Sequence, residues 1–550
     1  MSSKTQVCGL KDAAGYLAGL SRFGTRLGLE RSMFIMERLG HPERSFRAVH
    51  VGGTNGKGST SALVAGVLQA AGYRTGLYTS PHLVAVTERL KVGCVEIPDS
   101  ELSLLLREIE PVLDECRRKI EQPTEFEVIT ALAFLWFARQ RVDWAVIEVG
   151  LGGRLDATNV IAPEVSVVTP VALDHCDTLG GSLEEVALEK AGIMKRGVPV
   201  VVAPQPPKAA DTLRRTALER GAPLVETVEH VGDGLLLGEG LSGDEAFPHD
   251  ALPFGSPPLS ARSPNVLPLG EGLSPWDGRC LDAHPEEPLI YPLLPERTTN
   301  ELGPANLGGR PRPKSSPFPV MEPGTVAFKI VSSTLSGVVF DALALGSPFP
   351  SLRTGLLGSH QAQNAAGALG ALEVLRRSGV SSITRDAVYR GFREASWPGR
   401  LELVRLPGAP DILLDGAHNQ AGAETLARAL RELFPGRPVN HVVGIMSDKP
   451  AREMLQAVLP DSGLVVFTRP RSFRNPPFDP EELVRLAPER AGLEVAVLAD
   501  PLVALRRAAS YGRAEPKSLT CVWGSLYLVG DIKRGLQREK KDTGPSRSSL

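Results

Sequence analysis

The stretch that most constrains the fold of this chain is GGTNGKGST at residues 52–60. It follows the short β-rich run RAVHV and precedes STSALVAGVLQAAG, in which apolar residues recur with helical spacing. Glycines let backbone amides approach a phosphate closely, and the amino end of the following helix favours an anion. Strand, loop and helix together predict a phosphate-binding turn in an α/β protein.

The loop departs from the general P-loop pattern, because Gly58 separates Lys57 from the hydroxyl residues Ser59 and Thr60. Lys57 still supplies a positive charge for the outer phosphates, and Ser59 or Thr60 supplies a hydroxyl for Mg²⁺. A plain glycine turn before a helix would explain the first two glycines but not TNGKGST. Phosphate binding is therefore the favoured interpretation.

Alternating strands and helices are predicted over residues 47–204. The continuous apolar runs WAVIEVG, VSVVTP and VPVVVAP have strand length, which is typical of central parallel strands buried on both faces. Stretches of helical spacing occur at 100–120, 126–139 and 183–197. This rhythm predicts a parallel sheet with right-handed crossovers.

A second, smaller Rossmann-like α/β domain is predicted after the breaker cluster SWPGR at 396–400. Regular patterning resumes near Gly324, with a small-residue helix at 359–379. The runs LELVRL, DILLDGAHN, VNHVVGIM, GLVVFTRP, LEVAVLAD and LTCVWGSLYLV then read as strands between helices. We expect an N-terminal ATP-binding domain at 1–396, a C-terminal domain at 397–536 and a solvated tail at 537–550.

Residues 231–320 have a different composition, with 16 prolines and 12 glycines. Prolines remove backbone donors, and no periodic run survives between them. We expect a largely disordered insertion, with a proline-rich docking segment as the alternative.

Charge and cysteine content exclude several classes of protein. Lys plus Arg number 61 and Asp plus Glu number 63, so the net charge is −2 and gives no overall basic field for nucleic acid or membrane. The six cysteines form no CxxC pair, which argues against zinc ribbons, redox motifs and disulfide frameworks. No apolar run reaches transmembrane length, and the first residues lack a signal-peptide core. We expect a cytoplasmic enzyme without nucleic-acid or membrane partners.

Ten further motifs follow the loop in order: SPHLVAVTERL (80–90), TEFE (124–127), EVGLGGRLDATN (148–159), ALDHCDTLG (172–180), EKAGI (189–193), HQAQNAA (360–366), WPGR (397–400), DGAHN (415–419), SDK (447–449) and WGSLYLVGDI (523–532). With GTNGKGS, this series resembles the folylpolyglutamate synthase and dihydrofolate synthase family of the Mur ligase superfamily. The resemblance extends from about Leu20 to Leu536, apart from the proline-rich insertion.

The resemblance implies a Mur ligase-like fold and an ATP-dependent ligase. It implies that L-glutamate is added to tetrahydrofolate, to dihydropteroate or to both, by a monomer that uses ATP and two Mg²⁺ ions. A carboxylate is a poor electrophile, so transfer of the γ-phosphoryl group would first make an acyl phosphate, which an amine then attacks. The N-terminal domain would bind both ATP and the folate.

Catalytic and metal-binding roles also follow from the resemblance. It assigns catalysis to Lys57, Glu148, His175 and Lys190, and metal binding to Ser59, Ser80, Glu148, His175 and Lys190. Glu148 ends a buried strand, where a carboxylate is costly without a partner. Lys190 is implied to be carboxylated by carbon dioxide, which requires a neutral amine that burial would favour. Taken alone, Lys190 is a solvated helix lysine and His175 a structural histidine.

Nucleotide and substrate contacts are implied in both halves of the chain. For the nucleotide they are Thr54, Asn55, Gly56, Lys57, Gly58, Ser59, Thr60, Asn364, Arg400, Asp415 and His418. For the substrates they are Phe126, Glu127, Arg154, Asp156 and Ser525. We expect an active site in a cleft that closure of two domains assembles.

Two other functions stay open from the sequence. A Mur-type ligase for a cell-wall nucleotide precursor is disfavoured, since only about 50 residues precede the loop and leave no room for a separate uridine-nucleotide domain. A nucleotide switch that uses ATP without ligation is disfavoured by the second polar cluster DGAHN. The preference between dihydropteroate and tetrahydrofolate cannot be read from the sequence.

Overall fold

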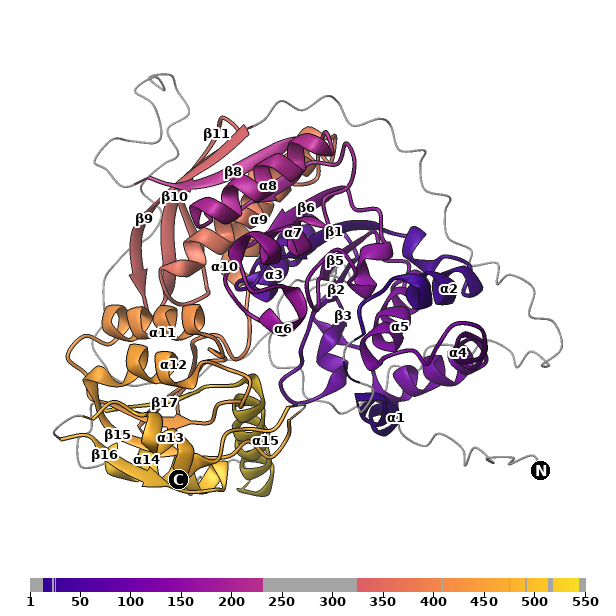
Figure 1. Ribbon diagram of the computed structural model, residues 1–550. Coiled ribbons are helices and arrows are strands. Elements are labelled where there is room, and N and C mark those ends of the chain that lie inside the picture. Colours follow the sequence, from indigo (N-terminus) through magenta and orange to yellow (C-terminus); the bar gives the residue numbers. More distant parts are fainter. Residues whose placement is uncertain are drawn as a thin grey trace, which may run out of the picture.

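The computed structural model describes residues 13–21, 24, 26–230, 324–406, 410–473, 475–489, 492–512 and 518–543. The described chain forms two α/β units, each built on its own sheet (Figure 1). The first unit runs from α1 to α10 and the second from β12 to α15. The predicted insertion at 231–320 lies outside the described residues.

The sheet of the first unit has eleven strands among the described residues, in the order β11-β10-β9-β8-β7-β6-β1-β5-β2-β3-β4. Parallel pairing joins the strands from β9 through β2, as predicted for the core of the sheet. The strands are β1 (Arg47–Gly52), β2 (Thr75–Tyr78), β3 (Leu90–Val92), β4 (Val95–Glu96), β5 (Trp144–Glu148), β6 (Val165–Val168), β7 (Val200–Val202), β8 (Leu224–Glu229), β9 (Gly324–Thr334), β10 (Gly337–Ala344) and β11 (Ser347–Thr354).

Antiparallel strands flank this parallel core, which the sequence did not predict. β9, β10 and β11 pair antiparallel at one edge, and β2, β3 and β4 do so at the other. Apolar runs reveal that a strand is buried, but not the direction of its neighbour.

Helices cover both faces of this sheet. They are α1 (Ala13–Leu20), α2 (Glu30–Arg38), α3 (Lys57–Ala70), α4 (Asp99–Lys119), α5 (Glu125–Arg139), α6 (Cys176–Leu179), α7 (Leu183–Ala191), α8 (Pro207–Glu219), α9 (His360–Arg377) and α10 (Arg385–Glu394), with the short 3₁₀ helices η2 (Pro42–Arg44), η3 (Val86–Arg89) and η4 (Ala157–Val160). Val49 and Val51 of β1 pack in the core formed with α3 and α9, whereas Ala48 packs in the core formed with α4 and α5. Side chains alternate across a strand, so burial on both faces yields the continuous apolar runs.

The second unit has a six-stranded sheet in the order β12-β13-β17-β14-β15-β16. Its strands are β12 (Glu402–Val404), β13 (Asp411–Leu414), β14 (Val439–Val443), β15 (Ser462–Phe467), β16 (Glu494–Val497) and β17 (Leu519–Trp523). Its helices are α11 (Gln420–Leu433), α12 (Ala451–Val458), α13 (Pro480–Leu486), α14 (Pro501–Gly512) and α15 (Leu526–Thr543), with η5 (Leu459–Asp461). All strand pairs are parallel except β12–β13.

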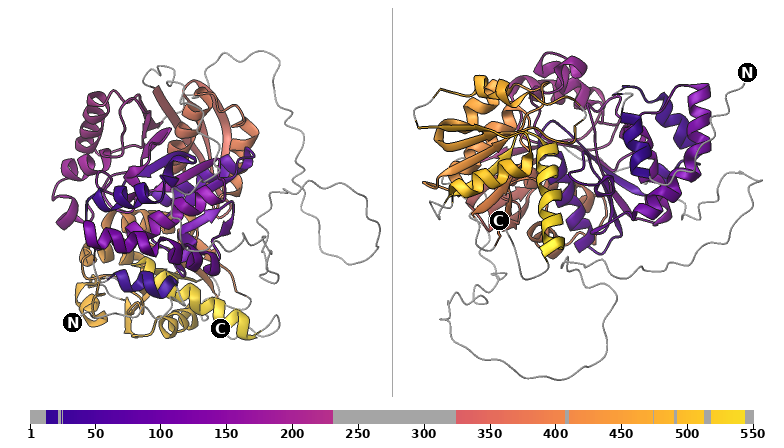
Figure 2. Two further views of the ribbon diagram at one scale, coloured as in Figure 1. Left: turned by 90° about the vertical axis from the view of Figure 1, so that its right-hand side faces the viewer. Right: turned by 90° about the horizontal axis from the view of Figure 1, so that it is seen from below.

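Two predictions for this unit are wrong in detail. LTCVWGSLYLV is not one strand, because β17 ends at Trp523 and α15 starts at Leu526. α15 then continues to Thr543, past residue 536, so the predicted tail begins as helix. Arg534 of α15 donates to the Val84 carbonyl of the first unit at 3.1 Å, and the helix lies along the boundary between the units (Figure 2).

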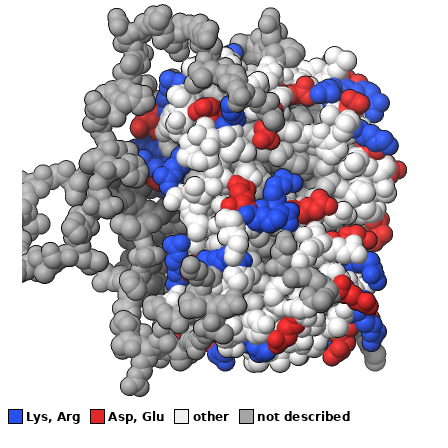
Figure 3. All heavy atoms as spheres, turned by 90° about the vertical axis from the view of Figure 1, so that its left-hand side faces the viewer, with Lys and Arg blue, Asp and Glu red and all other residues white. Residues whose placement is uncertain are grey.

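Charges of both signs are interspersed on the face drawn in Figure 3. That arrangement agrees with the balanced composition. Within the described ranges, no helix is long and apolar enough to cross a membrane.

Candidate functional site

The glycine-rich loop joins β1 to α3 at the centre of the larger sheet. Gly53 and Gly56 have φ of 133° and 88°, a region that favours glycine. A Cβ on Gly53 would lie 1.9 Å from the Thr169 Oγ1, and one on Gly56 would lie 2.2 Å from the Asn364 Oδ1. Backbone shape and crowding therefore both require glycine in this loop.

Gly58 has a steric reason for departing from the usual loop pattern. A Cβ at this position would lie 2.5 Å from the indole ring of Trp397, in the segment between the units. The hydroxyl function falls to the next two residues, and they differ: Ser59 lines the cavity, whereas Thr60 is fully buried and its hydroxyl donates to the Asn364 carbonyl at 3.5 Å. Ser59 is thus the hydroxyl placed for a ligand.

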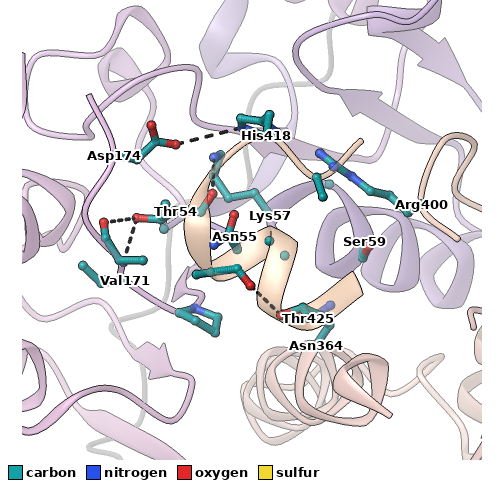
Figure 4. A pocket seen from close by; sticks show the side chains of 18 of the residues that line it. Thr54, Asn55, Lys57, Ser59, Val171, Asp174, Asn364, Arg400, His418 and Thr425 are labelled. Atoms are coloured by element: carbon teal, nitrogen blue, oxygen red, sulfur yellow. Dashed lines mark hydrogen bonds and ion pairs between the residues drawn. The ribbon is translucent and has the colours of Figure 1, made fainter. Parts of the chain in front are cut away.

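A cavity of about 450 Å³ lies between the two units, beside this loop. The residues predicted for the site that line it are Thr54, Asn55, Gly56, Lys57, Gly58, Ser59, Ser80, Glu148, His175, Lys190, Asn364, Arg400, Asp415 and His418. Figure 4 shows Lys57 and Ser59 at the start of α3, with Arg400 and His418 contributed by the second half of the chain. The cavity therefore unites the two groups of predicted residues.

Glu148 ends β5, next to the loop strand β1. Its Oε2 accepts a hydrogen bond from the Ser80 amide at 3.1 Å. Burial raises the pKa of Glu148 to about 7, although Lys57 and Arg400 favour its charged form. A carboxylate in this position is ready to bind a cation.

Lys190 is buried on α7, rather than solvated as the sequence alone suggested. Its Nζ donates to the Gly53 carbonyl at 2.9 Å. Burial, reinforced by Lys57, lowers the pKa of Lys190 to about 7. A substantial fraction of this side chain is therefore a neutral amine near neutral pH.

The second unit presents Asp415 and His418 after β13. Both Asp415 oxygens accept backbone bonds, from Leu401 at 2.9 Å and from Ala417 at 2.8 Å. The His418 Nδ1 donates to the Gly416 carbonyl at 2.7 Å, because a carbonyl can only accept. Burial lowers the pKa of His418 to about 4, which leaves its Nε2 as a neutral acceptor.

Asp174 joins the two units at the rim of the cavity. Its carboxylate pairs with the Lys449 Nζ at 2.8 Å and accepts from the Asn419 Nδ2 at 3.1 Å. His418 lies 4.0 Å away, the contact drawn in Figure 4. Although burial works against ionisation, the Lys449 ammonium holds the pKa of Asp174 well below its usual range.

Three of the five predicted substrate residues, Phe126, Asp156 and Ser525, support the cavity wall without lining the cavity. The Phe126 ring packs against Gly150, and Asp156 accepts from the Leu151 amide at 2.8 Å. Both Gly150 and Leu151 line the cavity. The Ser525 Oγ accepts from the backbone amide of Leu528 at 3.1 Å at the start of α15.

Two charged side chains predicted for the substrates have protein partners. Glu127 is buried, pairs with Arg31 at 2.8 Å and caps α5 through Thr124. Arg154 is half-exposed and pairs with Glu189 at 2.7 Å. Both ion pairs thus lie within the first unit.

Family models match both units of the chain. The Mur ligase middle domain model matches residues 51–229, and the model of the dihydrofolate synthetase C-terminal domain matches residues 406–536. The "Dihydrofolate synthase/folylpolyglutamate synthase" of Bacillus subtilis is 31% identical over 545 residues, which cover 96% of this chain and 99% of the relative. This chain belongs to the folylpolyglutamate synthase and dihydrofolate synthase family. The predicted family and ligase class are confirmed, which disfavours a nucleotide switch.

Solved structures of the family share the fold over nearly the whole chain. Folylpolyglutamate synthase of Mycobacterium tuberculosis, complexed with ADP and AMPPCP, has a TM-score of 0.70 at 27% identity and covers 98% of this chain and 99% of its own. The Thermotoga maritima folylpolyglutamate synthase has a TM-score of 0.68 at 28% identity, with 96% and 97% covered.

Donor chemistry at the cavity fits magnesium. Ser59, Ser80 and Glu148 offer hard oxygen ligands on one wall. No group of three or more His, Cys, Asp or Glu suited to a metal occurs in the described part of the chain. Mg²⁺ bound with nucleotides typically takes one or two carboxylates and completes its shell with phosphates and water, so this sparse set is adequate.

Asp174, Asn419, Lys449 and His360 were not among the predicted site residues. Each lies in a quoted motif, ALDHCDTLG, DGAHN, SDK or HQAQNAA. The motifs therefore contained these residues, but nothing in them indicated that Asp174 contacts Asn419 and Lys449, which lie 245 and 275 positions away.

Proposed function

We propose that this chain is an ATP-dependent ligase that joins L-glutamate to a reduced folate, to dihydropteroate or to both. One observation carries the proposal: a single cavity brings a phosphate-binding loop, the buried Glu148 and the guanidinium of Arg400 together between two units. Relatives named folylpolyglutamate and dihydrofolate synthase support the folate class of substrate. Action as a cytoplasmic monomer remains a prediction.

ATP binding follows from the loop geometry. The first amides of α3 and its dipole favour the phosphates, and Lys57 adds a point charge. His418 would contact the nucleotide from the second unit, Arg400 from the segment directly before β12, and Asn364 from α9. Removing water and placing positive groups around the transferring phosphoryl group would stabilise its charge.

Magnesium, when bound, would supply positive charge that neutralises the negative charge developing on the transferring phosphoryl group. Ser59, Ser80 and Glu148 would hold one ion. His175 and Lys190 would serve a second, with Lys190 carboxylated. For that modification the neutral Nζ attacks carbon dioxide: an N–C bond forms, one C=O π bond opens to a carboxylate oxygen, and one N–H proton passes to solvent. Burial of Lys190 supports the neutral form.

The residues behind the wall would shape the substrate side of the cavity. Phe126 supports Gly150, Asp156 holds the loop that bears Leu151, and Ser525 fixes the start of α15. We propose that Glu127 and Arg154 also act indirectly. Glu127 would act by capping α5, and Arg154 by pairing with Glu189, the residue before Lys190.

Product analysis tests the proposal. Purified protein is incubated with ATP, Mg²⁺, L-glutamate and either dihydropteroate or tetrahydrofolate, and the products are identified by mass. A gain of one glutamate on both acceptors supports a bifunctional enzyme, and a gain on tetrahydrofolate alone restricts it to polyglutamylation. Folded protein that binds ATP and yields neither product would contradict the proposal.

A further inference from the structure

Lys449 and Asp174 form a largely buried ion pair between the two units. Lys449 lies between β14 and α12, and Asp174 lies between β6 and α6. The Nζ–Oδ1 distance is 2.8 Å, and the two side chains are only 8% and 11% exposed. A charge pair with so little exposure is screened much less than a surface pair.

Asn419 adds a second connection at the same point. Its Nδ2 lies 3.1 Å from the other Asp174 oxygen and 3.1 Å from the Asn55 Oδ1 in the phosphate-binding loop. Lys449 and Asn419 of the second unit thus both bind the Asp174 carboxylate, and Asn419 also contacts the phosphate-binding loop directly.

Asp174 is in turn tied to the phosphate-binding loop through its own segment. The Thr54 hydroxyl donates to the Ala172 carbonyl at 3.0 Å, and the Ala172 backbone amide donates to the Thr54 Oγ1 at 3.1 Å. The Asn55 amide donates to the Pro170 carbonyl at 3.2 Å. Residues 170–174 therefore link the phosphate-binding loop to Lys449.

The second unit carries His418 into the cavity, and Arg400 enters it from the segment directly before β12. Their distance from the loop depends on how the second unit sits on the first, and the Lys449–Asp174 pair lies at that contact. Separation of the units would break the pair and withdraw both side chains from the nucleotide.

We propose that Lys449 and Asp174 are positioning residues that hold the second unit closed over the phosphate-binding loop. They need not touch the reacting atoms. This inference rests on the proposed function for its catalytic consequence, but nucleotide binding tests it without turnover. If only the closed arrangement binds nucleotide fully, apparent affinity falls with the closed fraction.

The test compares Lys449→Met with Lys449→Arg in the full chain. AMPPCP binding with Mg²⁺ is measured by calorimetry, and folding by thermal unfolding. We expect Lys449→Met to weaken AMPPCP binding by roughly 30-fold, with substantial rescue in Lys449→Arg, because a buried hydrogen-bonded charge is lost in one and kept in the other. Asp448→Asn is the matched control, since Asp448 also lies beside Lys449, at 3.5 Å, but its side chain is 31% exposed.

A double-mutant cycle with Asp174→Asn separates positioning from general damage. If the pair acts as a unit, the double variant binds AMPPCP about as well as the weaker single variant. Unchanged affinity in Lys449→Met, or additive losses in the double variant, would overturn the inference. Wild-type protein that binds AMPPCP but forms no folate product would overturn the proposed function and leave this test intact.

Discussion

Lys57 is the first residue of α3, and its Nζ lies 3.2 Å from the Thr54 carbonyl at the cavity wall. A charge held at the amino end of a helix, among free amides, is well placed to meet a phosphate. Besides this backbone contact, the charge of Lys57 acts on the buried Glu148 and Lys190 beside the cavity.

Lys57→Ala is therefore expected to remove most ligase turnover. Loss of a single preorganised stabilising group commonly costs about 100-fold or more in rate. Phosphate release is measured with acceptor and glutamate present. Lys119→Ala, on the exposed end of α4, should stay near wild type; near-normal release by Lys57→Ala would refute the assignment.

Gly58 packs against one aromatic neighbour, Trp397. The serine or threonine that follows the lysine in most P-loops should therefore destabilise this protein. Gly58→Ser places a Cβ against the Trp397 indole, and overpacking of this kind typically costs about 1–3 kcal/mol in unfolding free energy. Denaturant unfolding measures the loss, and adding Trp397→Phe should recover part of it. Gly19→Ser, where nothing lies within 4 Å, is the control. Equal stability of the two serine variants would disprove the steric explanation.

At the scale of elements, β14 and β17 of the second sheet share a buried polar contact. The Trp523 indole donates to the His441 Nδ1 at 3.1 Å, so this nitrogen must be unprotonated. Burial lowers the pKa of His441 to about 3. The contact therefore couples the stability of the sheet to pH.

Acid should destabilise the protein through His441. Between pH 3 and 6.5 the unfolded state binds more protons at this site than the folded state, so stability is full above pH 6.5 and falls as pH decreases. Going from pH 7 to pH 5 should cost about 2 kcal/mol through this residue. Chemical denaturation at both pH values measures it, and His441→Gln should show a smaller loss. The same pH dependence in both proteins would contradict the assignment.

Element positions followed closely from the pattern where apolar residues run without interruption. WAVIE and VSVV became β5 and β6, since strands buried on both faces need apolar residues at each position. The β17–α15 junction was missed because apolar residues continue through it, while Gly524, at φ 108°, and Ser525 turn the chain. The strand and helix propensities of the residues alone do not predict this turn between β17 and α15.

Site residues were predictable in the same uneven way. Local residue types and their spacing predict the phosphate-binding loop. The contact between Asp174 and Lys449 does not, because sequence holds no distance between residues 275 positions apart. Thr60 was predicted as a nucleotide contact and as the alternative to Ser59 for the Mg²⁺ hydroxyl, but helix geometry turns its side chain into the core.

On the scale of the whole molecule, the cavity has walls from both units, so a nucleotide should stabilise both together. AMPPCP with Mg²⁺ at about 100 times its Kd should add about 2.7 kcal/mol to the free energy of unfolding. Hydrogen exchange should slow in α3 and in α11 alike. Arg400→Met should reduce the effect in α11, and protection confined to α3 in the wild type would contradict a shared site.

The packing of Trp397 on Gly58 also bears on how this protein can change over evolutionary time. Position 58 belongs to the nucleotide loop and position 397 to the segment between the units, yet they occupy one volume. We therefore expect a serine or threonine at 58 to be better tolerated when a smaller residue stands at 397. On this steric ground we expect the residues at the two positions to vary together among relatives.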